Sequence, residues 1–183
     1  MNAKRALPVL VTGLLVALLT ACAATPATLS EPADAVLKLE SSAFADGATI
    51  PAEYTCSGED VSPELRWSGV PAQTQSFVLI MDDPDAPGAT FTHWLLFNIP
   101  ADVRQLDRAT KPVGIRGSNN FGLDTYGGPC PPAGLGAHRY YFTLYALDVP
   151  SLKVIPAGAR QEVENAMHGH ILAQTQLMGR FER

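Results

Sequence analysis

The chain has 183 residues, of which 46% are hydrophobic and 17% are charged, and its formal net charge is −5. This acidic balance argues against nucleic-acid binding and against electrostatic adhesion to anionic lipid, because both need clustered Lys and Arg. Lys4 and Arg5 precede an apolar run from Ala6 to Leu19, which is the layout of a secretory signal. We therefore expect a signal peptide over residues 1–21, whose removal leaves 11 basic residues against 18 acidic ones.

The end of this leader, Leu19-Thr20-Ala21-Cys22, resembles the bacterial lipobox, in which the cysteine is acylated. One alternative is an ordinary signal peptide that contains Cys22 by chance. A transmembrane anchor is disfavoured, because the apolar run is shorter than the roughly 20 residues that such an anchor needs. Several acyl chains would hold the protein on a membrane. We expect lipidation at Cys22 and a cell-envelope location, on the periplasmic face of the outer membrane if the host has two membranes.

The next residues, up to position 35, are rich in Ala, Pro and Thr and show no apolar periodicity. They predict a flexible tether over residues 22–35, which follows from their composition. The remaining residues, 36–183, are enough for one domain with a substantial core. We find no internal repeat and no second domain boundary in the sequence.

The first half of this domain predicts four strands. Residues 36–44 alternate at first, and a short strand is expected near 65–67 after a turn-rich stretch. The runs 76–87 and 91–100 are apolar without alternation, which is typical of strands buried on both faces. Each run ends in proline, which favours a strand end.

The second half predicts two more strands and one helix. Residues 138–150 are aromatic and β-branched, which favours a strand. A helix is expected over Ala159–His168, since apolar side chains share one side of it and Gly169 follows as a stop. Residues 171–182 alternate as a last strand. Together the elements predict a mostly-β domain, either a sandwich or a partial barrel.

Two cysteines, Cys56 and Cys130, lie inside the expected domain. In an exported protein such a pair is typical of a disulfide. Two buried thiols are one alternative, and a metal site with His93 or His138 is another. The close spacing that zinc sites usually have is absent, which disfavours the metal.

Polar side chains gather at the ends of three apolar runs: Asp82, Asp83 and Asp85 after the first, His93 in the second, and His138 and Tyr140 in the third. Each has an ordinary structural explanation, because aspartate before proline is common in turns and a lone histidine is often a satisfied core residue. Carboxylates at the mouth of a buried strand need partners, however, since burying them unpaired is costly. Their coincidence on three strands predicts a shared pocket.

The residue inventory favours binding over catalysis. The sequence lacks a G-x-S-x-G elbow, a P-loop, a dinucleotide fingerprint and H-E-x-x-H. Asp83 and His93 could act as acid and base, but no nucleophile completes the set, and a bridged Cys130 would be a poor one. We therefore expect no enzymatic activity, no cofactor and no metal.

Several motifs resemble the phosphatidylethanolamine-binding proteins, in their bacterial, Raf-kinase-inhibitor-like branch. They are, in order, YTCSGEDVSPELRWSGVP (54–71), DDPDAP (82–87), THWLLFNIP (92–100), GPCPPAGLGAHRYYFTLYALD (128–148) and MHGHILAQTQLMGRFER (167–183). The resemblance covers nearly the whole expected domain. It implies a two-sheet antiparallel β-sandwich with one or two short helices and a small anion-binding cavity at one end.

The resemblance also implies a set of ligand-binding residues: Asp83 with Asp85 beside it, His93, Pro131, Pro132, His138 and Tyr140. Family members hold phosphate, phosphorylethanolamine, acetate or cacodylate there, so the implied ligand is a small anionic or phosphorylated group, with a phospholipid head group as one candidate. Glycine permits close backbone approach and proline fixes φ, so the Gly- and Pro-rich stretch before His138 is expected to be a preformed rim.

Three functions remain open at this point. The leading hypothesis is a lipid-anchored envelope module that binds a small anionic group. The second is a modulator of a protein partner, or a protease- or kinase-type inhibitor, that uses the same pocket rim. The third is a weak hydrolase.

Overall fold

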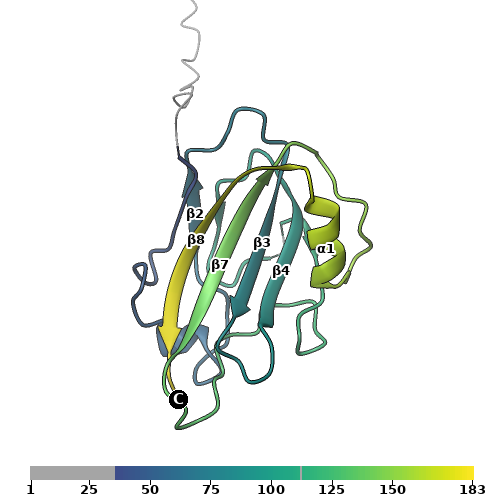
Figure 1. Ribbon diagram of the computed structural model, residues 1–183. Coiled ribbons are helices and arrows are strands. Elements are labelled where there is room, and N and C mark those ends of the chain that lie inside the picture. The colour runs from purple at the N-terminus through teal and green to yellow at the C-terminus, as the bar shows by residue number, and fades with distance from the viewer. Residues whose placement is uncertain (1–35, 112) are drawn as a thin grey trace, which may run out of the picture. The chain divides into compact units, whose positions relative to one another are not determined.

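The computed structural model describes residues 36–111 and 113–183, and within them two antiparallel sheets form most of the regular structure (Figure 1). The small sheet has the order β1-β2-β5, with β1 Lys38–Glu40, β2 Leu65–Ser68 and β5 Gln105–Leu106. A 3₁₀ turn, η1 Ala52–Tyr54, and one α-helix, α1 Arg160–Met167, complete the regular elements of the described chain. The predicted mostly-β, two-sheet class is confirmed.

The large sheet has the order β6-β4-β3-β7-β8. Its strands are β3 Ser76–Asp83, β4 Phe91–Pro100, β6 Ile115–Arg116, β7 His138–Leu147 and β8 Ile171–Phe181. The long strands and α1 lie where the sequence predicts them, while the two-residue strands β5 and β6 were not predicted. Such short pairings carry too few residues for a periodic signal.

The first predicted strand, residues 36–44, is shorter in the structure. It ends at Glu40 because the Ser41 hydroxyl donates to the Glu64 carbonyl at 2.6 Å and accepts the Ala43 amide at 3.1 Å. A serine side chain that bonds its own backbone offers the chain an alternative to ladder hydrogen bonds. The turn therefore replaces the second half of the expected strand.

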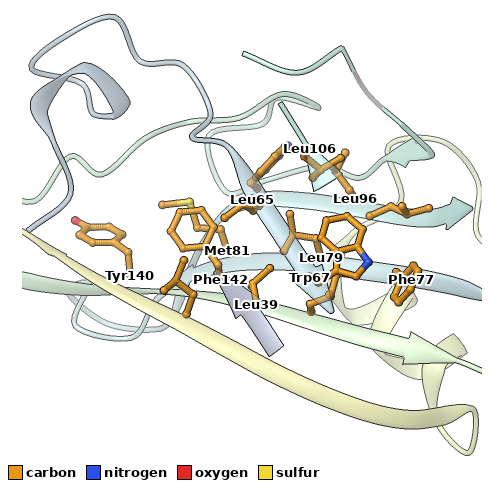
Figure 2. Packing of buried hydrophobic residues seen from close by; sticks show 14 of the residues in the cluster. Leu39, Leu65, Trp67, Phe77, Leu79, Met81, Leu96, Leu106, Tyr140 and Phe142 are labelled. Carbon is orange, nitrogen blue, oxygen red and sulfur yellow. The ribbon is translucent and has the colours of Figure 1, made fainter. Parts of the chain in front are cut away.

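The main core lies between the two sheets, and the side chains labelled in Figure 2 come from both of them. The small sheet contributes Leu39, Leu65, Trp67 and Leu106, and the large sheet contributes Phe77, Leu79, Met81, Leu96, Tyr140 and Phe142. Trp67 meets Phe77 edge to face, with ring centroids 5.5 Å apart. This geometry is favourable for aromatic pairs.

A second core covers the other face of the large sheet. Val78 and Ile80 of β3 pack there with Val163 and Met167 of α1, and Figure 1 shows the helix next to β4. Because both faces of β3 are covered, all eight of its residues are buried. This confirms the prediction from the unbroken apolar run.

Polar contacts tie the start of α1 to this face. The Arg160 guanidinium lies 2.6 Å from an Asp82 carboxylate oxygen and 2.7 Å from Glu164, and the Thr92 hydroxyl donates to Asp82 at 3.0 Å. Burial raises the pKa of Asp82, while the charge of Arg160 opposes that rise. The cluster satisfies a carboxylate that β3 would otherwise bury alone.

No helix in the described residues is long and apolar enough to span a membrane. The expected signal peptide, the lipidated Cys22 and the tether, residues 1–35, lie outside the described residues.

Replacing Leu79 with alanine should lower the free energy of unfolding by about 3–5 kcal/mol, since the side chain is fully buried and its removal leaves a cavity. Urea unfolding followed by tryptophan fluorescence measures the loss. Leu172→Ala is the matched control, because Leu172 is 37% exposed and its truncation should cost no more than about 0.5 kcal/mol. Equal losses for the two variants would contradict the packing described here.

Candidate functional site

A small cavity lies at the end of the large sheet where β3 ends and β4 and β7 begin. Its volume is about 180 Å³, and it is lined by Asp83, Ala86, Pro87, Phe91, His93, Phe121, Cys130, Pro131, Pro132 and His138. Pockets for drug-sized ligands span roughly 300–1,000 Å³, so this one suits a much smaller group. The antiparallel order of the three strands places their polar ends together, which explains why residues far apart in sequence share one cavity.

A buried histidine–carboxylate pair forms one wall. The Nδ1 atom of His138 lies 2.7 Å from an Asp83 carboxylate oxygen, and both side chains are almost fully buried. The other Asp83 oxygen accepts the Asp85 amide at 2.8 Å. Asp83 therefore holds the His138 ring from the Nδ1 side, and the Nε2 atom has no hydrogen bond among the described residues.

A β-bulge places His93 on the cavity side of the sheet. Met81 pairs with Trp94 and Asp82 pairs with Thr92, so His93 is the extra residue between the two pairs. Regular alternation would put His93 on the same face as Leu95, which packs in the core under α1. The bulge shifts the alternation by one residue and turns the imidazole toward Asp83 and His138 instead.

The orientation and tautomer of His93 follow from its partners. Its Nδ1 atom lies 2.8 Å from the Gly127 carbonyl oxygen. Because a carbonyl can only accept, Nδ1 carries the hydrogen. Burial lowers the pKa of His93, although the Gly127 carbonyl and the charge of Asp83 act in the opposite direction. The ring is therefore neutral near pH 7, with an unprotonated Nε2.

Two phenylalanines that sequence reasoning missed complete an aromatic wall. The ring centroids of Phe91 and Phe121 lie 4.7 Å apart and lie 5.0 and 5.4 Å from that of His93. Phe91 could have been found from its position two residues before His93 on the same strand. Phe121 comes from a loop whose path gave no sequence signal, and it packs where Gly127 leaves room for its ring.

The rim loop, residues 127–137, is held by contacts with the segment around η1. The Gly128 amide donates to an Asp60 carboxylate oxygen at 2.7 Å, and the Cys56 amide donates to the Pro129 carbonyl at 3.1 Å. A Cβ at Gly128 would lie 2.4 Å from the Tyr54 carbonyl oxygen, so only glycine fits this close approach. These contacts fix Pro131 and Pro132 as the outer wall of the cavity.

The structure joins Cys56 and Cys130 in a disulfide, with Cα atoms 5.4 Å apart. Of the three states considered for these cysteines, this is the one found. The Arg183 guanidinium lies 3.4 Å from the Cys130 sulfur. In the described part of the chain, no cluster of three or more His, Cys, Asp or Glu side chains is arranged to hold a metal ion.

Two of the expected ligand residues lie beside the cavity and do not line it. Asp85 forms a two-pronged ion pair with Arg139, at 2.9 and 2.6 Å, and these hydrogen bonds lower the pKa of Asp85 to about 2. Tyr140 packs edge to face against His93 at 5.2 Å and is fully buried. Burial and the negative charge of Asp83 raise the pKa of Tyr140, which stays a neutral phenol.

The protein is therefore a two-sheet β-protein with a small cavity at the ends of its central strands. The profile described as "Phosphatidylethanolamine-binding protein" matches residues 40–182. The chain therefore belongs to the phosphatidylethanolamine-binding protein family, as the motif resemblance indicated.

Individual proteins support the assignment. A "UPF0098 protein" of Aquifex aeolicus is 48% identical over 154 residues, which cover 81% of this chain and 90% of the relative. A Mycobacterium tuberculosis protein named "Putative lipoprotein LppC" is 40% identical, covering 89% of this chain and 79% of the relative. The solved structure of the Chlamydia trachomatis homologue CT736 superimposes with a TM-score of 0.77 at 38% identity, covering 81% of this chain and 98% of the other.

Replacing both Cys56 and Cys130 with alanine should lower the free energy of unfolding by about 2–4 kcal/mol. The bridge closes a sequence separation of 74 residues and so restricts the unfolded chain. Urea unfolding curves with and without a reductant measure the effect. The reductant should shift the wild-type midpoint and leave that of the double variant in place, whereas an unshifted wild type would contradict the bridge.

Proposed function

We propose that the protein is an envelope-anchored, non-enzymatic binding module whose cavity recognises a small anionic group such as phosphate or phosphorylethanolamine. The observation that carries the proposal is the meeting of the Asp83–His138 pair and His93 on one cavity of about 180 Å³. Both imidazoles are held through Nδ1, at 2.7 and 2.8 Å. Prearranged polar groups on an otherwise apolar wall are typical of a ligand site.

The chemistry of the lining residues suits a phosphorylated amine. Asp83 lies against Nδ1 of His138, so it would compensate a positive charge on that ring when Nε2–H donates to an anionic oxygen. The carboxylate keeps lone pairs that an ammonium group could reach. The apolar wall of Phe91, Phe121 and the rim prolines excludes water, which strengthens such contacts.

The same inventory supports binding without turnover. Cys130 lines the cavity, but its sulfur is bonded to Cys56 and so is no free thiolate. The Asp83 carboxylate is held by His138 and by the Asp85 amide. A site of this kind can orient an ester without supplying an activated nucleophile.

We further propose that residues 1–21 are a signal peptide, that Cys22 carries the lipid anchor, and that residues 22–35 are the tether. The name of the mycobacterial relative supports this proposal. The anchor would place the cavity in the cell envelope, at the periplasmic face of the outer membrane in a host with two membranes.

A protein partner is the second candidate ligand. Two loops that contribute lining residues also expose large apolar side chains: Phe121 is 46% exposed, Leu123 53% and Leu135 66%. Exposed apolar groups around a cavity are typical of a protein-binding surface. If the ligand is a protein, the cavity holds a phosphorylated or acidic side chain of that partner, and the protein acts as a modulator or inhibitor.

Titration calorimetry of the full chain in detergent tests the leading proposal. Phosphate and phosphorylethanolamine should bind saturably, and His138→Ala should weaken both by at least about tenfold, because it removes a charge-assisted hydrogen bond.

His170→Ala is the matched control, since its Nδ1 atom also contacts a carboxylate, that of Asp148, at 2.8 Å, but lies outside the cavity lining. The control should bind as the wild type does. Absence of binding to the wild type would overturn the proposal, and equal weakening by both variants would place the site elsewhere.

Changing Cys22 to serine tests the anchor. Wild-type cells fed labelled palmitate should give a labelled protein that sediments with membranes, and the variant should lose the label, because its side chain cannot carry the thioether-linked lipid. Ser30→Ala in the tether should leave the label unchanged. An unlabelled wild type would contradict the lipid anchor.

A further inference from the structure

We infer that the cavity discriminates between anions by their protons: it requires one hydrogen-bond donor on the ligand, for His93, and one anionic oxygen, for His138. A phosphate that carries a P–OH group meets both requirements, and sulfate meets only the second. This inference rests on the proposed anion-binding function and names the ligand class more narrowly. The two histidines differ in role because their Nδ1 atoms have different partners.

The environment of His93 makes it an acceptor. Its Nδ1–H is committed to the Gly127 carbonyl, and a carbonyl cannot compensate a positive charge as a carboxylate can. The ring lies among the rings of Phe91, Phe121 and Tyr140, at centroid distances of 5.0–5.4 Å. Nε2 therefore offers a lone pair, which repels an unprotonated oxyanion and accepts from a hydroxyl or ammonium group.

Charged groups on every element around His93 are consistent with this role. Asp83 on β3 and Asp60 from the segment after η1 favour the charged imidazole, but burial has the larger, opposite effect. On β7, the phenol of Tyr140 is uncharged and His138 is balanced by Asp83. The rim loop places Cys130, Pro131 and Pro132 on the cavity and no charged side chain.

The environment of His138 makes it the donor. Its Nδ1 lies against a carboxylate that is itself buried, so a positive charge on this ring is compensated within the site. Both ring nitrogens carry hydrogen only in the charged imidazolium. Nε2–H can then donate to an oxyanion while Nδ1–H still donates to Asp83.

The prolines of the wall and the Asp85 amide offer an anion no donor. Pro87, Pro131 and Pro132 line the cavity and have no backbone N–H. The Asp85 amide, next to the lining, already donates to Asp83. An anion therefore finds no donor in these groups. The Tyr140 hydroxyl near Asp83 is buried without a hydrogen-bond partner among the described residues and is a further donor, but it does not relieve the repulsion between an unprotonated oxyanion and the His93 lone pair.

The inference also predicts how the affinity for a phosphate monoester depends on pH. A phosphate monoester loses its last proton at about pH 6, after which it can no longer donate to His93. Binding of a monoester above that pH must take up a proton from solvent, so the affinity for a monoester falls as the pH rises. Inorganic phosphate keeps one P–OH group as HPO4²⁻ and needs no such uptake. Sulfate has the same tetrahedral shape and carries no proton anywhere in this range.

Calorimetry of the full chain with inorganic phosphate and with sulfate, at about pH 6, tests the inference. Phosphate should bind at least about tenfold more tightly, because sulfate leaves the His93 lone pair facing an oxyanion. Titrations of the wild type at about pH 8, in two buffers of different ionisation enthalpy, should show an uptake of about one proton more for methyl phosphate, a monoester without a P–OH group at this pH, than for inorganic phosphate, which keeps one. This second measurement needs no variant.

The variant His93→Gln supplies the sharpest comparison, because a Gln side-chain amide can donate as well as accept. Its preference for phosphate over sulfate should fall to within about threefold, through a gain in sulfate affinity. Equal binding of both anions by the wild type, or equal proton uptake for methyl phosphate and inorganic phosphate at the higher pH, would overturn the inference and leave the proposed anion site intact. Failure of the wild type to bind either anion would overturn the proposed function as well.

Discussion

The burial of β3 on both faces is the constraint on which the rest of the structure depends. The second sheet covers one face of this strand and α1 covers the other, so a polar side chain on the strand cannot reach solvent on either face. Its two last residues are carboxylates, and each needs a partner. Asp82 meets Arg160 on the helix side, and Asp83 meets His138 on the other. One pair secures the helix, and the other forms the candidate site.

In the candidate site, two imidazole rings are held in place by the protein, and each keeps one ring nitrogen for a ligand. Asp83 and Gly127 hold the two imidazoles through Nδ1, so both Nε2 atoms remain for a ligand. The disulfide and the Gly128–Asp60 contact hold the rim loop against the segment around η1. A cavity that is formed before binding loses little conformational entropy when a ligand enters. This explains the dense use of glycine and proline before His138.

Family membership and the geometry of the site contribute different kinds of information. Membership in the phosphatidylethanolamine-binding protein family rests on the match over residues 40–182. A fold shared by many proteins does not identify a ligand, whereas individual donors and acceptors can. The opposite roles of His93 and His138 follow from this chain's own hydrogen bonds. They are the basis of the inferred preference for phosphate over sulfate.

The sequence by itself determined the mostly-β class, the long strands and the helix, because each of these elements leaves an apolar run or a periodic pattern over eight or more residues. It also indicated that Asp83, His93 and His138 share a pocket, since polar groups at buried strand ends need partners. Only the tertiary structure decided that His93 faces the cavity, because one extra residue in β4 reverses the period-2 alternation. Tertiary contacts likewise placed Phe121 in the wall and left Asp85 paired with Arg139 outside it. Those positions depend on loop paths and on partners distant in sequence, which local patterns do not encode.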